Sequence, residues 1–384
     1  CWDVDSPEYK EHKPKNFEMV QVKPNWHDSS ELIGYVSRIN GERYIVGPFL
    51  RFLVKAIHDQ KHPYFLCLDE MNLAPVEQYF AEFLSVIESR TVDENHKNSK
   101  YFGDVELNSE LKATTDIECV KGADIVLLAV PTIAIDPICH QINDLLDKKI
   151  IIINVSKGFH PETNERMSEV IRRCIDEDKL SSVVSLIGPS HAEEVVIRLL
   201  TTIDAVSLKN EDAVAVQNLF SNQYLRIYTG NDEIGSELGV AIKNVMAIAS
   251  GILSGLGYQD NTRAALITRG LQEMIRYGVH FGGQQKTFMG LTGIGDLIVT
   301  CTSVHSRNFE AGYQIGKENS VENFFKNNTK TVEGVRTAKI VHRVAEENGI
   351  DMPICEEVYQ ILFNGKLPSD CAQDLMIRDL KKEF

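Results

Sequence analysis

The pattern of apolar and polar positions changes along the chain, from alternating strands and helices to helices alone. Between about residues 91 and 236, short apolar runs alternate with amphipathic segments, which is typical of buried parallel strands joined by crossover helices. The expected strands are 124–130, 150–155 and 183–187, and the expected helices are 132–146 and 162–175. The pattern therefore predicts a Rossmann-like α/β domain at 91–236 and an all-α domain at 237–384.

Residues 1–90 form a third segment. An apolar run at 64–68, closed by Asp69 and Glu70, predicts a buried parallel strand between helices at 48–58 and 75–88. Such a strand holds magnesium in P-loop NTPases, but a core strand with solvated acids explains it equally well. The phosphate-binding pattern GxxxxGK[ST] is absent from the sequence, so we interpret this segment as a fragment that does not bind nucleotide.

Composition and charge restrict the classes of function that this protein can have. The net charge of −15 argues against a nucleic-acid partner, because phosphate contacts require a concentrated positive field. No two of the eight cysteines have zinc-knuckle spacing, so reduced thiols and no metal site are expected. No apolar run is long enough to span a bilayer. Because the sequence begins at Cys1 without a signal pattern, we expect a truncated start and a cytoplasmic protein.

Lys243 is the clearest chemical anomaly. Its helical neighbours three and four positions away are Gly239, Val240, Met246 and Ala247, so the lysine is expected on a buried face. Loss of hydration lowers the pKa of an ammonium group toward neutrality, which suits a general acid or base. A lysine that extends out of a core helix into solvent is the alternative.

Two strand ends add candidate residues. Strand 150–155 leads directly to Lys157, at the sheet edge where open α/β sheets bind ligands; an ordinary surface charge is the alternative. The second strand leads through Gly188 to a helix start in which Ser190 and Glu193 have capping-box spacing. Free N–H groups there suit an anion, although capping alone would explain the pattern.

Two polar clusters in the helical domain suit phosphate chemistry. A glycine-rich turn at 290–295 precedes Asp296, and the segment Ser306-Arg307-Asn308 follows soon afterwards. A hydroxyl, a guanidinium and an amide together can bind a phosphate monoester. A solvated helix start is the alternative.

Taken in order, these motifs closely resemble the bacterial-type NAD(P)-dependent glycerol-3-phosphate dehydrogenases, from about Val92 to Phe384. The resemblance implies that a sheet domain holds NAD(P)H and a helical domain closes over dihydroxyacetone phosphate. Hydride transfer then gives sn-glycerol 3-phosphate for glycerophospholipid synthesis. It also implies a small-molecule substrate and allows a homodimer.

The resemblance assigns roles by position. Lys243 would donate or accept the proton, Lys157 would polarise the substrate oxygen, and Asp296 would hold Lys243 in register. The implied substrate-binding residues are Lys157, Gly188, Ser190, Lys243, Asn244, Asp296, Thr300, Ser306, Arg307 and Asn308. The implied cofactor-binding residues are Lys157, Ala192, Arg307, Thr331 and Glu333.

The chain departs from this family at its start. The family's first βαβ unit, about 40 residues with a GxGxxG-like turn, has no counterpart in the sequence. The turn binds the cofactor pyrophosphate, so we expect weak or absent NAD(P)H binding. One hypothesis is that strand 64–68 fills the vacant place in the sheet.

Residues 1–90, which stand where the family has its first βαβ unit, resemble another class of protein. Residues 22–28, 32–35 and 69–74 resemble the AAA+ motor of methylcytosine-specific restriction GTPases, with Asp69 and Glu70 as a Walker B pair. Two alternatives to an active dehydrogenase follow from this fusion. One is an inactive chimera, and the other is an AAA+ subunit of a restriction motor, against which the missing GxxxxGK[ST] weighs.

Overall fold

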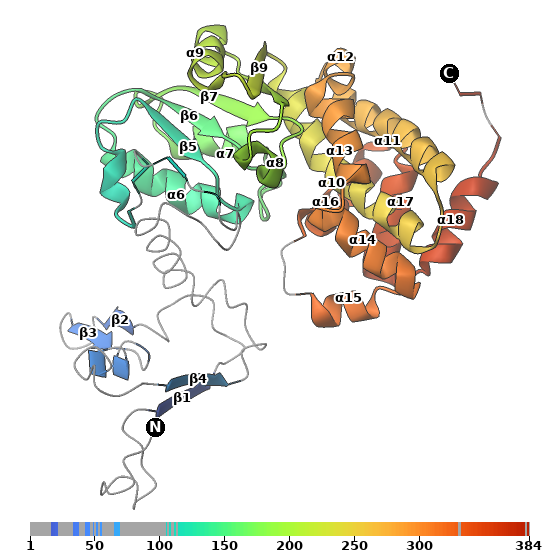
Figure 1. Ribbon diagram of the computed structural model, residues 1–384, viewed down its shortest axis with the longest axis horizontal. Helices are drawn as coiled ribbons and strands as arrows, with labels where there is room; N and C mark the ends of the chain where they lie inside the picture. Colours follow the sequence, from blue (N-terminus) through green and yellow to red (C-terminus); the bar gives the residue numbers. More distant parts are fainter. Residues whose placement is uncertain are drawn as a thin grey trace, which may run out of the picture. The chain divides into compact units, whose positions relative to one another are not determined.

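The computed structural model describes two compact units, Cys1–Thr115 and Asp116–Phe384 (Figure 1). In the first unit the described residues are four strands and scattered positions between 49 and 112. In the second they are 116–328, 332–380 and 382–383; positions 114 and 115, at the end of the first unit, are also described.

The first unit contains two small sheets. Strand β1 (Phe17–Gln21) pairs in parallel with β4 (Phe65–Asp69), and β2 (Gly34–Ser37) pairs antiparallel with β3 (Arg43–Val46). The strand expected at 64–68 is therefore present. Its partner is β1, so the hypothesis that it fills a place in the dehydrogenase sheet is wrong. Glu70 and the helix expected at 75–88 lie outside the described residues.

The second unit begins with a five-stranded sheet of order β5-β6-β7-β8-β9. The strands are Ile125–Leu128, Ile150–Asn154, Leu180–Ile187, Thr201–Val206 and Leu225–Gly230. The first three are parallel, which confirms the three predicted strands. Strand β8 runs antiparallel to β7, and β9 is parallel to β8.

Helices cover both faces of this sheet because its strands are apolar on both sides. On one face, Ile150 and Ile152 pack with Ile135 of α6 (Thr132–Leu145) and Ile171 of α7 (Met167–Cys174). On the other, Ile153 shares a core with Val216 of α9 (Asn210–Phe220). Figure 1 shows α6 and α9 on opposite sides of the strands. The two crossover helices predicted from periodicity are thus confirmed, with α7 shorter than expected.

The rest of the unit is helical, as predicted, and surrounds one central helix, α10 (Glu233–Gly255). Within the described residues α10 alone is long and apolar enough to cross a membrane, so the expectation that no apolar run reaches this length is wrong. However, 83% of its apolar window is buried in the protein. That burial is typical of a core helix. The other elements are α11 (Asp260–His280), α12 (Gln285–Phe288), η4 (Leu291–Gly295), α13 (Asp296–Thr302), α14 (Arg307–Glu318), α15 (Glu322–Asn327), α16 (Glu333–Asn348), α17 (Pro353–Asn364) and α18 (Pro368–Ile377).

Two buried carboxylates of α10 connect the helical domain to the sheet domain. Glu237 accepts hydrogen bonds from the backbone N–H and hydroxyl of Ser168 at 3.1 and 2.6 Å, and Glu233 accepts two from Arg172 at 2.7 and 2.6 Å. Bidentate, charge-assisted bonds of this kind are strong and directional. They hold the N-terminal turns of α10, which lead to Lys243, at a defined position relative to the sheet.

Close packing of α10 against α14 depends on glycine. A Cβ atom added at Gly312 would overlap the backbone of Ile248, and one added at Gly251 would overlap the backbone of Phe309. We therefore expect Gly312→Ala to lower the free energy of unfolding by about 1–3 kcal/mol, the usual effect of overpacking. Urea unfolding measures this change. Gly230→Ala is the matched control because its Cβ would meet ordinary contacts; an equal loss in both variants would contradict the prediction.

Candidate active site

Two lysines from different domains share one buried carboxylate. The Nζ atom of Lys243, in the middle of α10, lies 2.7 Å from Oδ1 of Asp296. The Nζ atom of Lys157, just beyond β6, lies 3.1 Å from Oδ2 of the same residue. Lys243 is 4% exposed and Asp296 is 1% exposed. The structure thus confirms that Lys243 is buried and that Lys157 follows the carboxyl end of β6.

Hydrogen bonds orient both ammonium groups. Lys243 donates to Oγ1 of Thr300 at 2.6 Å, and that hydroxyl donates to the backbone oxygen of Asp296, also at 2.6 Å. The Thr300 proton is therefore engaged, and its lone pair faces Lys243. Lys157 donates to the backbone oxygen of Gly188 at 2.9 Å. Among the described residues each amine has two acceptors, which leaves it one further N–H bond.

Burial and the neighbouring charges shift the pKa values of Lys243 and Asp296. It lowers the pKa of Lys243 to about 8, and the positive charge of Lys157 acts in the same direction against the opposing effect of Asp296. Burial raises the pKa of Asp296, but the charges of Lys157 and Lys243 outweigh it and hold that pKa below its usual value. Asp296 stays ionised while Lys243 can exchange a proton near neutrality.

The local fold places Asp296 and Thr300 on one helix face. The segment Leu291–Gly295 is a π-helical turn, and Asp296 is the first residue of α13. Residues four apart on a helix share a face, so Asp296 and Thr300 both reach Lys243. The turn predicted at 290–295 is thus present, and it is π-helical, a geometry frequent at functional sites.

A second network joins three helices beside the lysines. Asn308 of α14 donates to Oδ1 of Asn244 at 3.1 Å and accepts from the backbone N–H of Gly334 at 2.9 Å. Asn244 in turn donates to Glu333 at 3.4 Å. Burial raises the pKa of Glu333, against the charges of Lys157, Lys243 and Arg307. Because the charges of Lys157, Lys243 and Arg307 all lower the pKa of Glu333, the network of Asn244, Asn308 and Glu333 lies next to the lysine cluster.

The residues expected to bind phosphate are only partly free to do so. Ser306 caps α14 and accepts the N–H of Phe309 at 3.3 Å, which matches the helix-start alternative for this residue. Asn308 uses its amide in the network above. Arg307, the first residue of α14, is exposed. Of Ser306, Arg307 and Asn308, Arg307 is therefore the exposed, charged residue that is free to bind a phosphate.

The turn after β7 differs from the predicted capping box. Helix α8 (Ala192–Val196) has His191 as its N-cap residue and no side-chain cap. Ser190 instead donates its hydroxyl to the backbone oxygen of Gly188 at 3.1 Å. Gly188 has a φ of 147°, and this left-handed turn directs Ser190 back toward the strand. The capping-box prediction is wrong. Thr331 lies outside the described residues.

His191 completes the site and was not among the predicted residues. Its Nε2 atom is buried without a partner among the described residues, and its ring centroid lies 6.1 Å from that of His305. Burial lowers the pKa of His191, and the charges of Lys243 and Lys157 lower it further. A neutral imidazole with an unpaired nitrogen beside two cations is a place where a polar ligand group would be satisfied. Nothing in residue spacing distinguishes His191 in its turn.

The parallel strands with a lysine at their carboxyl edge, and the helical domain that supplies a second, buried lysine, fit the class of two-domain nicotinamide-dependent dehydrogenases. The family model for the N-terminus of NAD-dependent glycerol-3-phosphate dehydrogenase matches residues 80–214, and the model for its C-terminus matches 232–373. The chain belongs to this family.

Individual relatives agree with the family models. The chain is 50% identical over 293 residues to glycerol-3-phosphate dehydrogenase [NAD(P)+] of Listeria monocytogenes serotype 4b, an alignment of 76% of this chain and 87% of the relative. The Staphylococcus haemolyticus protein of that name is 45% identical over 77% of this chain and 89% of its own. The glycerol-3-phosphate dehydrogenase structure from Coxiella burnetii has a TM-score of 0.71 at 31% identity, covering 76% of this chain and 89% of its own.

The residues around the lysine cluster suit the nicotinamide end of NAD(P)H, but the sequence lacks the turn that binds its pyrophosphate. Lys157, Arg307 and Glu333, with the unpaired nitrogen of His191, offer charged and polar groups for the nicotinamide end and for substrate. The pyrophosphate end requires backbone N–H groups at a glycine turn, and GxGxxG does not occur in the sequence.

Proposed function

We propose that this chain catalyses the NAD(P)H-dependent reduction of dihydroxyacetone phosphate to sn-glycerol 3-phosphate, the backbone of glycerophospholipids, and the reverse oxidation. The single observation that carries the proposal is the buried Lys243–Asp296–Lys157 cluster, which unites the two domains. Family membership and relatives of that name support it. The proposal includes a cytoplasmic location, a homodimer and no nucleic-acid partner.

In this mechanism the two lysines act on the same substrate oxygen. The bound nicotinamide supplies the hydride. Lys157 polarises the carbonyl by placing a fixed positive charge where alkoxide character develops. Lys243 donates its proton to that oxygen in the reduction and accepts it in the oxidation. Asp296 holds both amines in place through its two oxygens, and Thr300 fixes the direction of Lys243.

The remaining residues are assigned by position around this cluster. Arg307, exposed at the start of α14, would bind the substrate phosphate together with the helix N-terminus. The other proposed substrate contacts are Gly188, Ser190, Asn244, Ser306 and Asn308. The proposed nucleotide contacts are Lys157, Ala192, Arg307, Thr331 and Glu333.

The test is consumption of NADH by the intact chain, followed by absorbance with dihydroxyacetone phosphate and, separately, with dihydroxyacetone. We expect turnover with the phosphorylated ketone and little with the unphosphorylated one, because only the former engages Arg307. Equal rates would reject phosphate recognition at this site. Absence of turnover at saturating NADH would reject the proposed activity.

The pH dependence should follow Lys243, whose pKa burial lowers to about 8. Oxidation of glycerol 3-phosphate needs the neutral amine, so its kcat should rise as pH increases through about 8. Reduction needs the ammonium form, so its kcat should fall over the same range. Initial rates between pH 6 and about 10 measure both profiles. Parallel profiles in the two directions would contradict a single acid–base group.

Cofactor binding should be weak because the pyrophosphate turn is missing. At such a turn, backbone N–H groups and the helix dipole bind the pyrophosphate of the cofactor. Side chains do not replace these interactions. We expect NADH fluorescence titration of the intact chain to show no saturation at micromolar cofactor. A micromolar isotherm would contradict this expectation. The same missing turn favours the second candidate function, a folded chain that does not turn over.

For residues 1–90 we propose an AAA+-like fragment with a Walker B strand and no Walker A loop. Its support is the parallel pairing of β1 with β4, which ends at Asp69, and the motifs at 22–28, 32–35 and 69–74. The alternative of a restriction-motor subunit gains nothing from the family models, which match 80–214 and 232–373. Binding of a fluorescent guanine nucleotide by the intact chain would reject the fragment interpretation. The proposed boundaries are 1–90, 91–236 and 237–384.

A further inference from the structure

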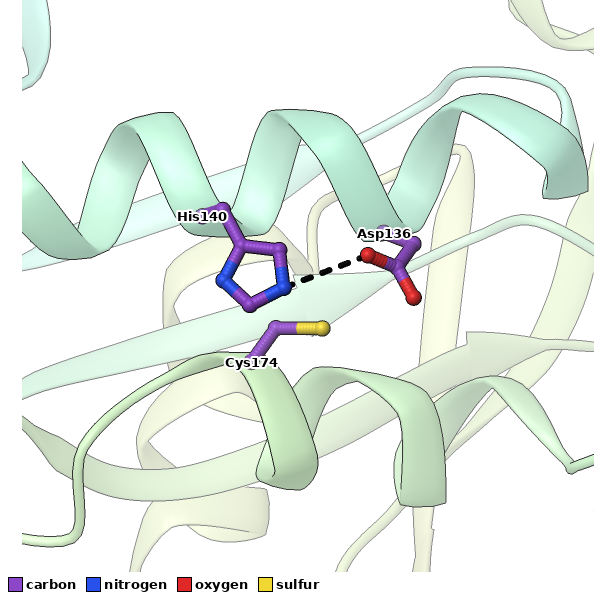
Figure 2. A group of neighbouring side chains, drawn as sticks. All are labelled: Asp136, His140 and Cys174. Carbon is purple, nitrogen blue, oxygen red and sulfur yellow. Dashed lines mark ion pairs between the residues drawn. The ribbon is translucent and has the colours of Figure 1, made fainter.

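Three side chains of metal-ligand type converge on the sheet domain, outside the candidate active site. Asp136 and His140 lie on α6, and Cys174 is the last residue of α7. One ligand atom of each lies within 4.8 Å of the other two. Figure 2 shows the imidazole and the carboxylate of α6 side by side, with the thiol of α7 facing them. Helical spacing explains part of this geometry, because residues four apart share a helix face.

The carboxylate of Asp136 divides its two oxygens between different partners. Arg173 donates to Oδ2 at 2.8 Å, while Oδ1 lies 3.3 Å from Nε2 of His140. Arg173 is itself held by Glu165 at 3.0 to 3.3 Å. Oδ1 is thus directed toward His140, while Arg173 holds the other oxygen of the carboxylate. Partners of this kind commonly orient the carboxylates that bind metals.

The charged groups near these three side chains have an excess of negative charge, which favours binding of a cation. Asp136 and Glu165 carry two negative charges against the single positive charge of Arg173. An exposed ion pair such as His140 with Asp136 contributes little to stability, so as a plain surface pair it has no strong role. The thiol sulfur of Cys174 accepts a weak hydrogen bond from Nη1 of Arg173 at 3.7 Å. A divalent ion would neutralise the excess charge and would replace the thiol proton with a metal–sulfur bond.

The donor atoms select the kind of ion. Imidazole nitrogen and thiolate sulfur with one carboxylate oxygen suit Zn²⁺, whereas Mg²⁺ and Ca²⁺ prefer oxygen alone. In a tetrahedral zinc site, bonds of about 2.0–2.3 Å place the ligand atoms roughly 3.3–3.6 Å apart. Side-chain rotations of His140, which is exposed, would close the present separation. Solvent can provide the fourth ligand at this open face.

We propose that Asp136, His140 and Cys174 bind one zinc ion that links α6 to α7, with water as its fourth ligand. Both helices cover one face of the five-stranded sheet and share its core. Bound zinc would therefore crosslink the layer that supports β6 and the lysine that follows it. The site needs neither substrate nor nicotinamide, so its existence does not depend on the proposed enzymatic activity.

Cobalt titration of the intact, metal-free and reduced chain tests the proposal. Co²⁺ reports its ligands directly, because a thiolate ligand gives a charge-transfer band and a tetrahedral site gives intense visible bands. We expect one Co²⁺ per chain with both signatures, displaced by one equivalent of Zn²⁺. Absence of these bands in the unmodified chain would overturn the proposal.

Two variants and two controls locate the ion. His140→Gln, at an exposed position that does not threaten folding, should weaken Zn²⁺ binding by about 100-fold or more, beyond the effect of losing an outer-sphere partner. Cys174→Ser should remove the charge-transfer band. Cys119→Ser and His280→Gln, both exposed and outside the cluster, should change neither. Unchanged affinity in His140→Gln, or a charge-transfer band that persists in Cys174→Ser, would overturn the proposal.

Discussion

Replacing Lys243 with methionine should lower kcat for dihydroxyacetone phosphate reduction by about 10²–10⁴-fold, the usual contribution of a general acid. Methionine keeps the length and apolar stem of the side chain, and Asp296 keeps Lys157 as a partner at 3.1 Å. The variant should therefore fold. Steady-state NADH oxidation measures kcat, and circular dichroism checks the fold.

The matched control for this prediction is Lys339→Met. Lys339 is an exposed lysine of α16, so its loss should leave kcat within about twofold of the unmodified chain. If Lys243→Met and Lys339→Met turned over at the same rate as the unmodified chain, Lys243 would not be the proton donor. The buried amine would then have only a structural role.

Asp296→Asn should lower kcat by about 10²-fold, because both lysines lose the group that positions them. It should also move the pH profile of glycerol 3-phosphate oxidation to lower pH. Asp296 is the group that raises the pKa of Lys243 against burial and the charge of Lys157, so its loss lowers that pKa further below about 8. The neutral, reactive amine would then form at lower pH. The pH dependence of kcat in the two proteins measures this shift.

The same substitution should destabilise the fold. Two ammonium groups would remain near each other without a compensating anion, and breaking a buried ion pair typically costs about 3–5 kcal/mol. Lys157 is partly exposed, so the lower end of this range is expected. Asp260→Asn, at an exposed position of α11, is the control and should affect neither stability nor the pH profile. An upward or absent shift in Asp296→Asn would contradict the assigned electrostatics.

Local periodicity predicted the strands whose sequences are largely apolar. Strands β5 to β7 contribute to the cores on both faces of the sheet. Continuous runs of Ile, Val and Leu indicate β5 and β6 directly, and in the predicted part of β7 only Ser185 interrupts the run. Strands β8 and β9 were not predicted. Thr202 and Asp204 interrupt β8, and β9 has exposed residues at Arg226 and Tyr228, so neither strand has a continuous apolar run.

Site residues were predictable only one at a time. The apolar neighbours of Lys243 indicated its burial, and the preceding strand placed Lys157 at the sheet edge. Their common partner was not predictable from spacing, because Asp296 is 139 positions from Lys157 in the sequence. The resemblance to a dehydrogenase family implied that these residues share one site. His191 was missed because its unpaired nitrogen is a property of packing.

The pairing of β4 shows a different limit. Its apolar run at 64–68 predicted a parallel strand correctly, but apolar composition does not specify which strand lies beside it. The structure pairs β4 with β1 of the same unit. Strand partners depend on contacts between distant segments, and a single sequence contains no direct signal for them.

The most direct test of the proposed chemistry is titration of the Lys243 side chain by NMR, in protein with ¹³C-labelled lysine. The resonance is assigned by its loss in Lys243→Met. We expect this lysine to titrate near pH 8, well below the ordinary lysine value of 10.5. A Lys243 that titrated together with the exposed lysines would contradict the assignment of a buried, proton-exchanging amine at this site.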